Sequence, residues 1–205
     1  MRKINFFSIM ACLLMLTAAC NKDKDSEPDR TPSISIVHFS KIASFADLNS
    51  FIGRTDIAAL KSDFSTDDYW VRDKTNGFSA EKHYETSTTT QNTSYNFEVS
   101  QGVITSANFH YGESFFPLES LKVFVSERIN EEINYSSGKT MESYSGHIIN
   151  GTDTLTFQSR DEFNAWLSSA VLAENIKGDS ECTYDNYITK VDIYYNDCGI
   201  TITRR

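Results

Sequence analysis

The stretch "YNFEVSQGVITSANFHYG", Tyr95 to Gly112, decides the fold class, because it predicts two antiparallel strands joined by a turn. Residues 100–102, Ser-Gln-Gly, are the turn signal, and the runs on both sides favour extended structure. Side chains alternate between the two faces of a strand, so one face of the second strand carries Val103, Thr105, Ala107, Phe109 and Tyr111. We expect Phe109 and Tyr111 to face the core, and Ile104, Ser106, Asn108 and His110 to face the other way.

Three other segments follow helical spacing. Residues 45–52 follow Ser44, which imitates a capping box together with Asp47, and a second short helix can restart at Thr55 and run to Leu60. Residues 160–171 follow Ser159, which forms a full capping box with Glu162, and they carry an apolar stripe that ends at Val171. Residues 118–134 are ambiguous. Their apolar spacing favours a helix, while Val123-Phe124-Val125 is typical of a strand.

Further strands are predicted on both sides of these helices. Short extended runs are expected at residues 34–39 and 69–71, and Asn150-Gly151 predicts the turn of a hairpin within residues 143–157. The chain ends with another hairpin, residues 187–203, whose connection is Asn196 to Gly199. These elements predict an α+β fold, an antiparallel sheet with about three helices packed on it and a β-hairpin at the C-terminus.

The N-terminus has the three parts of a secretory signal. Arg2 and Lys3 form the basic start, residues 4–16 are largely apolar, and small residues stand at 17–19. The alternative, a retained membrane anchor, is disfavoured because the apolar run is shorter than the roughly 20 residues that span a bilayer. Leu16-Thr17-Ala18-Ala19-Cys20 resembles the lipobox of bacterial lipoproteins, although Thr17 departs from the commonest pattern. The resemblance implies cleavage before Cys20 and attachment of fatty acyl chains to that cysteine.

The polar run after Cys20 predicts a tether. Residues 21–33 contain lysines, acids and prolines but no apolar residue, so we expect residues 20–33 to be a disordered link. Residues 34–205 then form one domain. The Lys/Asp run resembles the export tracts of surface lipoproteins in Bacteroidota, and Asn21 after the cysteine fits the outer membrane. The resemblance implies a lipid-anchored outer-membrane protein, with the cell surface slightly favoured over the periplasmic face.

The chain is acidic, which excludes nucleic acid as a partner. Loss of residues 1–19, which contain Arg2, Lys3 and no acid, changes the net charge from −9 to −11. Nucleic-acid binding needs a basic face. Acidity also argues against adhesion to anionic headgroups beyond the lipid anchor, and its simplest effect is to keep the protein soluble.

Two cysteines of the mature chain remain after Cys12 leaves with the leader and Cys20 takes lipid. In an oxidising compartment Cys182 and Cys198 are expected to form a disulfide. Closing a loop of this size stabilises a fold by about 3 kcal/mol in the chain-entropy model. The alternative, a two-cysteine metal site, lacks nearby histidines.

No catalytic site, metal site or cofactor is predicted. The four histidines, His38, His83, His110 and His147, are dispersed, although His83 and His110 could meet across a sheet. The adjacent acids Asp67-Asp68 and Glu131-Glu132 are expected to be solvated charges, because neighbouring side chains on a regular element diverge. The Gly138-Lys139-Thr140 segment lacks the first glycine of a phosphate loop.

Two surface features suggest recognition. Tyr69 and Trp70 are candidate ligand-contacting residues, since an exposed aromatic ring can stack on a sugar or pack on a partner. The alternative is that Trp70 lies in the core. Asp153-Thr154-Leu155 resembles the short O-glycosylation pattern of Bacteroidota, which implies Thr154 as a candidate glycan acceptor.

The sequence therefore favours a lipid-anchored binding or interaction module whose partner is an envelope protein or a glycan. One alternative is an inhibitor or immunity lipoprotein that caps an enzyme or toxin. The other is an envelope hydrolase whose site assembles from distant residues. A binding module should expose an aromatic patch near Tyr69 and Trp70, an enzyme should have a pocket with convergent polar groups, and an inhibitor should offer one broad acidic face.

Overall fold

The structure is a computed structural model that describes residues 42–205. The predicted leader, Cys20, the tether and the strand at 34–39 fall outside the described residues. Residues 42–205 form one antiparallel sheet of nine strands with four helices, so the predicted α+β class is confirmed.

The sheet consists of two groups of strands. The first is a meander of β1 (Trp70–Lys74), β2 (Gly77–Glu85), β3 (Thr90–Ser100) and β4 (Val103–Glu113). The second contains β5 (Met141–Asn150), β6 (Asp153–Phe157), β7 (Lys177–Tyr184), β8 (Tyr187–Tyr194) and β9 (Asp197–Arg204). The spatial order is β1-β2-β3-β4-β9-β8-β7-β5-β6, so β4 and β9 join the two groups.

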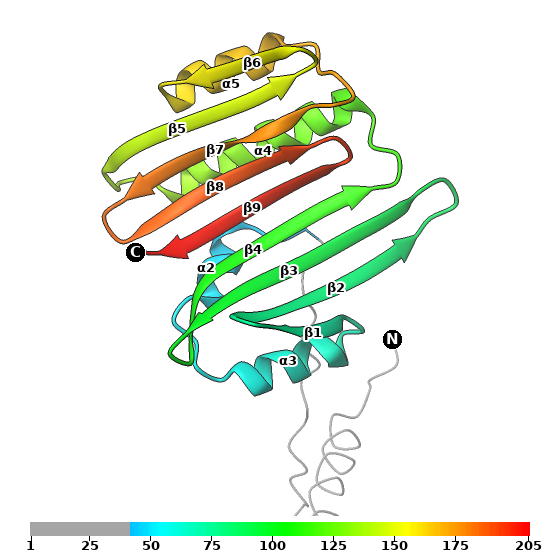
Figure 1. The fold of residues 1–205 in the computed structure, drawn as a ribbon, viewed down its shortest axis with the longest axis vertical. Coiled ribbons are helices and arrows are strands. Elements are labelled where there is room, and N and C mark those ends of the chain that lie inside the picture. The colour runs from blue at the N-terminus through cyan, green and yellow to red at the C-terminus, as the bar shows by residue number, and fades with distance from the viewer. Residues whose placement is uncertain (1–41) are drawn as a thin grey trace, which may run out of the picture. The chain divides into compact units, whose positions relative to one another are not determined.

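The helices pack against one face of this sheet. They are α2 (Phe45–Phe51), α3 (Ile57–Thr66), α4 (Leu118–Tyr135) and α5 (Arg160–Ser169). Figure 1 shows α2 and α4 behind the strands. Helix α3 is longer than expected, while α5 ends before Val171, which is 83% exposed, so the prediction that Val171 belongs to the apolar stripe is wrong.

The local signals account for most of these elements. The hairpin at 100–102 is confirmed, and its turn residues Gln101 and Gly102 both have the positive φ that a tight hairpin turn requires. Ser44 caps α2 in a capping box with Asp47, and the ambiguous segment 118–134 is the helix α4. The buried residues of α4 are three or four apart, so they lie on one side of the helix, and this side faces the sheet.

The core lies between the helices and the sheet. Phe109 and Tyr111 face it as predicted, at 2% and 6% exposure. Ile104 was expected on the other face but is fully buried, because a register shift in the β3–β4 pairing, between Glu98 and Val99, inserts an extra residue and reverses the alternation of side chains at this end of β4. The Ile104 backbone also pairs with Gly53 and Arg54 in the α2–α3 connection. The connection covers this end of β4.

The predicted disulfide between Cys182 and Cys198 is not formed, and both thiols are free and buried. These cysteines lie on β7 and β9, with β8 between them. On β8 they pair with Thr189 and Ile193, which are four residues apart. That interval spans about 13 Å along a strand, whereas bonded cysteines need Cα atoms within about 7 Å. The order of the strands therefore keeps the two thiols apart.

Candidate functional site

The face of the sheet opposite the helices is covered by no element of residues 42–205 (Figure 1). On each central strand, one set of alternating side chains is buried and apolar, and the other set is polar and mostly part-exposed. On β4, for example, Ala107 and Phe109 face the core, while Asn108 and His110 face outward. We call this outward polar surface the open face.

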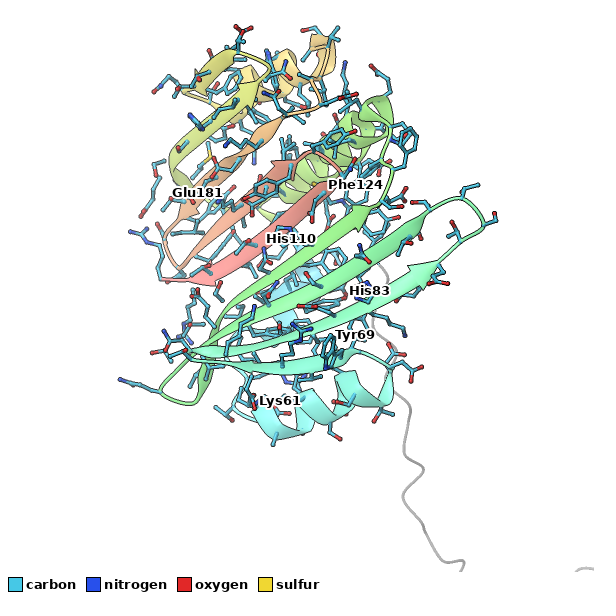
Figure 2. All side chains as sticks on the ribbon, turned by 45° about the vertical axis from the view of Figure 1, so that its right-hand side comes forward. Lys61, Tyr69, His83, His110, Phe124 and Glu181 are labelled. Atoms are coloured by element: carbon cyan, nitrogen blue, oxygen red, sulfur yellow. The ribbon has the colours of Figure 1, made fainter. Side chains whose placement is uncertain are left out.

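The strand register aligns polar residues from all nine strands on the open face. One lateral row follows the cross-strand pairs from β1 to β6: Trp70, Glu81, Ser94, His110, Gly199, Asp192, Asp179, His147 and Thr156. The next row carries Arg72, Ser79, Asn96, Asn108, Thr201, Lys190, Glu181 and Ser145. Figure 2 shows His110 on the middle strands, with His83 and Glu181 on either side of it. Residues far apart in the chain thus form one continuous surface.

His110 and Asp197 form an ion pair at the centre of the open face. The His110 Nδ1 atom lies 2.9 Å from Asp197 Oδ1. The ring lies over Gly199, where a Cβ atom would come within 2.6 Å of His110 Cε1, so the missing side chain makes room for the imidazole. Burial lowers the pKa of His110, but the hydrogen bond and charge of Asp197, with the charge of Asp192, outweigh it and raise that pKa.

Lys190 forms a second charged group beside it. Its Nζ atom lies 2.9 Å from both Asp179 Oδ2 and Asp192 Oδ1. Burial lowers the pKa of Lys190, but the two carboxylates raise it above its ordinary value. These residues line a shallow hollow of about 180 Å³ that also contacts His147 and Tyr194. The hollow offers charged groups of both signs within a small area.

Hydrogen bonds between side chains hold much of the remaining open face. Asn96 donates to Asn108 at 3.2 Å, and Asn108 donates to Thr201 at 2.8 Å. The Ser106 and Thr203 hydroxyls lie 2.8 Å apart. These bonds fix the side chains across β3, β4 and β9, so that a partner would meet a pre-organised surface.

The two predicted aromatic residues point in opposite directions. Tyr69 is 4% exposed, packs on Phe64 and Tyr95 at 5.2 and 5.8 Å, and has a pKa raised by burial. Tyr69 is therefore a core residue, and the prediction that it contacts a ligand is wrong. Trp70 is 60% exposed, and the Arg72 guanidinium lies 3.5 Å from its ring centroid. Trp70 belongs to the open face and stands at its β1 edge.

The remaining candidate residues are dispersed. Thr154 is exposed on β6, which is the other edge strand of the sheet. His83 and His110 are separated by β3, and His83 pairs instead with Asn92. Within residues 42–205 no group of three or more His, Cys, Asp or Glu side chains could hold a metal ion. Cys20 and His38 lie outside the described residues.

Glu132 is a buried charge, so the prediction that it is solvated is wrong. It is 3% exposed and accepts hydrogen bonds from Tyr184 at 2.7 Å, Thr189 at 2.9 Å and Arg160 at 2.5 Å. Glu132 lies three residues after Ile129, on the buried side of α4, and this spacing was the available signal. The group is enclosed between α4, α5 and the sheet, so it is a structural network rather than a site, and removal of one partner would leave an uncompensated buried charge.

No family model matches the chain, and comparisons with curated proteins and with solved structures give no match either. None of the helices in residues 42–205 has the length and apolar character needed to cross a membrane. Assignment of the site therefore depends on the geometry of the open face itself.

We expect the His110–Asp197 pair to stabilise the fold most at low pH. Because the folded-state pKa of His110 is raised, the stabilisation is complete below about pH 6.5 and is lost as pH rises through the folded-state value. In urea denaturation between about pH 5.5 and 9, the unfolding free energy of the wild type should fall with rising pH by less than about 1 kcal/mol. His110→Gln should not show this decrease.

His147→Gln is the matched control for this measurement. His147 is exposed on the same lateral row, and three strands separate it from His110, so its replacement should leave the His110–Asp197 pair and the stability that depends on it in place. Identical pH profiles for the wild type and His110→Gln would show that the pair does not contribute.

Proposed function

We propose that this protein is a lipid-anchored envelope protein whose folded domain binds a partner through the open face. The observation that supports this most is the arrangement of the layers. All four helices of residues 42–205 pack on one side of the sheet, and the other side presents aligned polar side chains from nine strands. An area of this size and polarity suits a broad contact better than a small buried substrate.

The chemistry of the open face favours binding over catalysis. His110 is bonded to Asp197, but among the described residues no serine, threonine or cysteine is bonded to its other ring nitrogen. A hydrolase that uses a serine, threonine or cysteine nucleophile needs that side chain bonded to a base, and the base bonded to an orienting group. The open face instead supplies fixed hydrogen-bonding groups and charges, which give specificity to an association.

The partner that fits best is another envelope protein or a glycan. The face carries charges of both signs, with Arg72, Lys177 and Lys190 among the acids. Trp70 and Tyr194 are 60% and 44% exposed, and their rings can stack on a sugar or pack on a protein. An inhibitor or immunity lipoprotein was expected to show one broad acidic face, and this mixed face supports that alternative less well.

The lipid on Cys20 would confine the domain to the membrane plane. Acyl chains contribute about 0.8 kcal/mol per buried methylene, so two or more chains give stable attachment. Confinement raises the effective concentration of the domain relative to a partner in the same membrane. A weak contact at the open face is then sufficient for function.

Crosslinking on intact producing cells tests the binding surface. We expect a photo-crosslinking amino acid at His83, exposed on the open face, to capture one partner, protein or glycan, in stoichiometric amount. The matched position is Asp161, exposed on α5 at the helical side, which should capture nothing above background. Equal capture from both positions, or capture from Asp161 alone, would contradict the assignment of the open face.

Mass spectrometry of the mature N-terminus tests the anchor separately. We expect the first residue to be Cys20, with a mass increased by acyl chains on its sulfur and amino group. A Cys20→Ser variant should leave the membrane fraction. Recovery of an N-terminal peptide with unmodified Cys20 would rule out lipid anchoring without affecting the binding proposal.

A further inference from the structure

A second surface feature lies on the helical side, away from the open face. It is a groove of about 450 Å³ between the end of β4 and the first half of α4. The rings of Tyr111, Phe116 and Phe124 form its aromatic lining, and Glu113, Glu119 and Glu127 supply its charges. Figure 2 shows Phe124 on α4, above the end of β4. We call this feature the aromatic–acidic groove.

The three rings of the groove contact one another. Tyr111 lies 6.1 Å from Phe116 and 5.3 Å from Phe124, and Phe116 lies 6.0 Å from Phe124, measured between ring centroids. Tyr111 and Phe116 are each 6% exposed, so they are held by the core. The faces of such rings carry partial negative charge and attract cations.

The charges of the groove are all negative. No lysine, arginine or histidine of the described residues lines it. Glu113 is held in place by hydrogen bonds from the Tyr111 hydroxyl and from Gln91 at 2.8 Å. Glu119 and Glu127 are exposed, lie two turns apart on one side of α4, and form no ion pair within residues 42–205.

Arg128, which follows Glu127 in the chain, is occupied elsewhere. Arg128 lies 2.7 Å from Glu131, and its guanidinium lies 5.1 Å from the centre of the Phe124 ring. Arg128 does not line the groove, so it leaves Glu119 and Glu127 unneutralised. It does show that Phe124 can accept a guanidinium against its ring.

Apolar side chains border the same groove. Val123 lines it between Glu119 and Glu127 in the chain and is 58% exposed, and Ile42 also lines it, at 40% exposure. Phe115, beside Phe116 in the chain, is 67% exposed. Exposed apolar residues gathered at one place mark interaction sites. A ligand for this groove therefore needs a cationic head and an apolar stem.

We propose that the aromatic–acidic groove binds a basic segment of a partner protein, with an arginine or lysine side chain between the rings and the glutamates. The methylene stem of such a side chain would pack on Val123, and its charge would be neutralised by Glu119 and Glu127. The groove has room for more than one residue, which suits a peptide segment rather than a simple amine. This surface is distinct from the open face, and the proposal does not depend on the function proposed there.

Titration of the purified protein with two peptides tests the proposal. The probes are acetyl-Leu-Arg-Ala-Arg-Leu-amide and the same peptide with citrulline, which keeps the shape of arginine but removes its charge. Binding is followed by two-dimensional amide NMR. We expect the arginine peptide to bind at least about fivefold more tightly than the citrulline peptide, with its shifts concentrated at residues 119–127.

Three variants assign the effect to the groove. The double variant Glu119→Gln and Glu127→Gln should weaken binding of the arginine peptide by about fivefold. Its affinity for the citrulline peptide should be unchanged. Val123→Arg places a guanidinium of the protein itself in the groove and should abolish binding of both peptides. Glu174→Gln is the control, because Glu174 is an exposed glutamate outside the groove.

Several results would overturn the proposal. These are equal affinity for the two peptides, no binding of either peptide, and a double glutamine variant that binds like Glu174→Gln. Shifts confined to the open face, around Asp179 and Asp192, would also reject the groove while leaving the open face as a binding surface. Shifts at residues 119–127 that disappear in the double variant would establish the site.

Discussion

The pairing of β4 with β9 is the interaction on which the rest of the structure depends. It joins Ser106–Gly112 to Asp197–Thr203 in antiparallel register, across about ninety residues of intervening chain. Without it the protein would contain two separate groups of strands, each with an exposed edge. The register is specified because Phe109 and Ile200 face the core together, and a one-residue slip would turn both toward solvent.

This single pairing explains the surfaces from which function is inferred. It places His110 over Gly199 and beside Asp197, so the central ion pair of the open face exists only when the two halves meet. It also lets α4, which connects the halves, pack across β8 and β9. The aromatic–acidic groove then forms where β4 ends and α4 begins. Both surfaces are thus consequences of one long-range contact.

Local structure could be predicted from the sequence, because its causes are local. Capping residues, turn dipeptides and apolar spacing correctly indicated the helices and hairpins around Ser44, Gln101 and Ser159. The open face could not be predicted, since its residues come from nine strands whose order is set by long-range pairing. The same reason explains the wrong disulfide, because only the order of β7, β8 and β9 separates Cys182 from Cys198.

The most direct test is an NMR measurement of nuclear Overhauser effects between β4 and β9. The account predicts cross-strand contacts between Asn108 and Thr201 and between Phe109 and Ile200, with both halves of the sheet reorienting as one body. Absence of these contacts, or different rotational correlation times for residues 70–113 and 141–204, would contradict the single sheet. The open face would then have no structural basis.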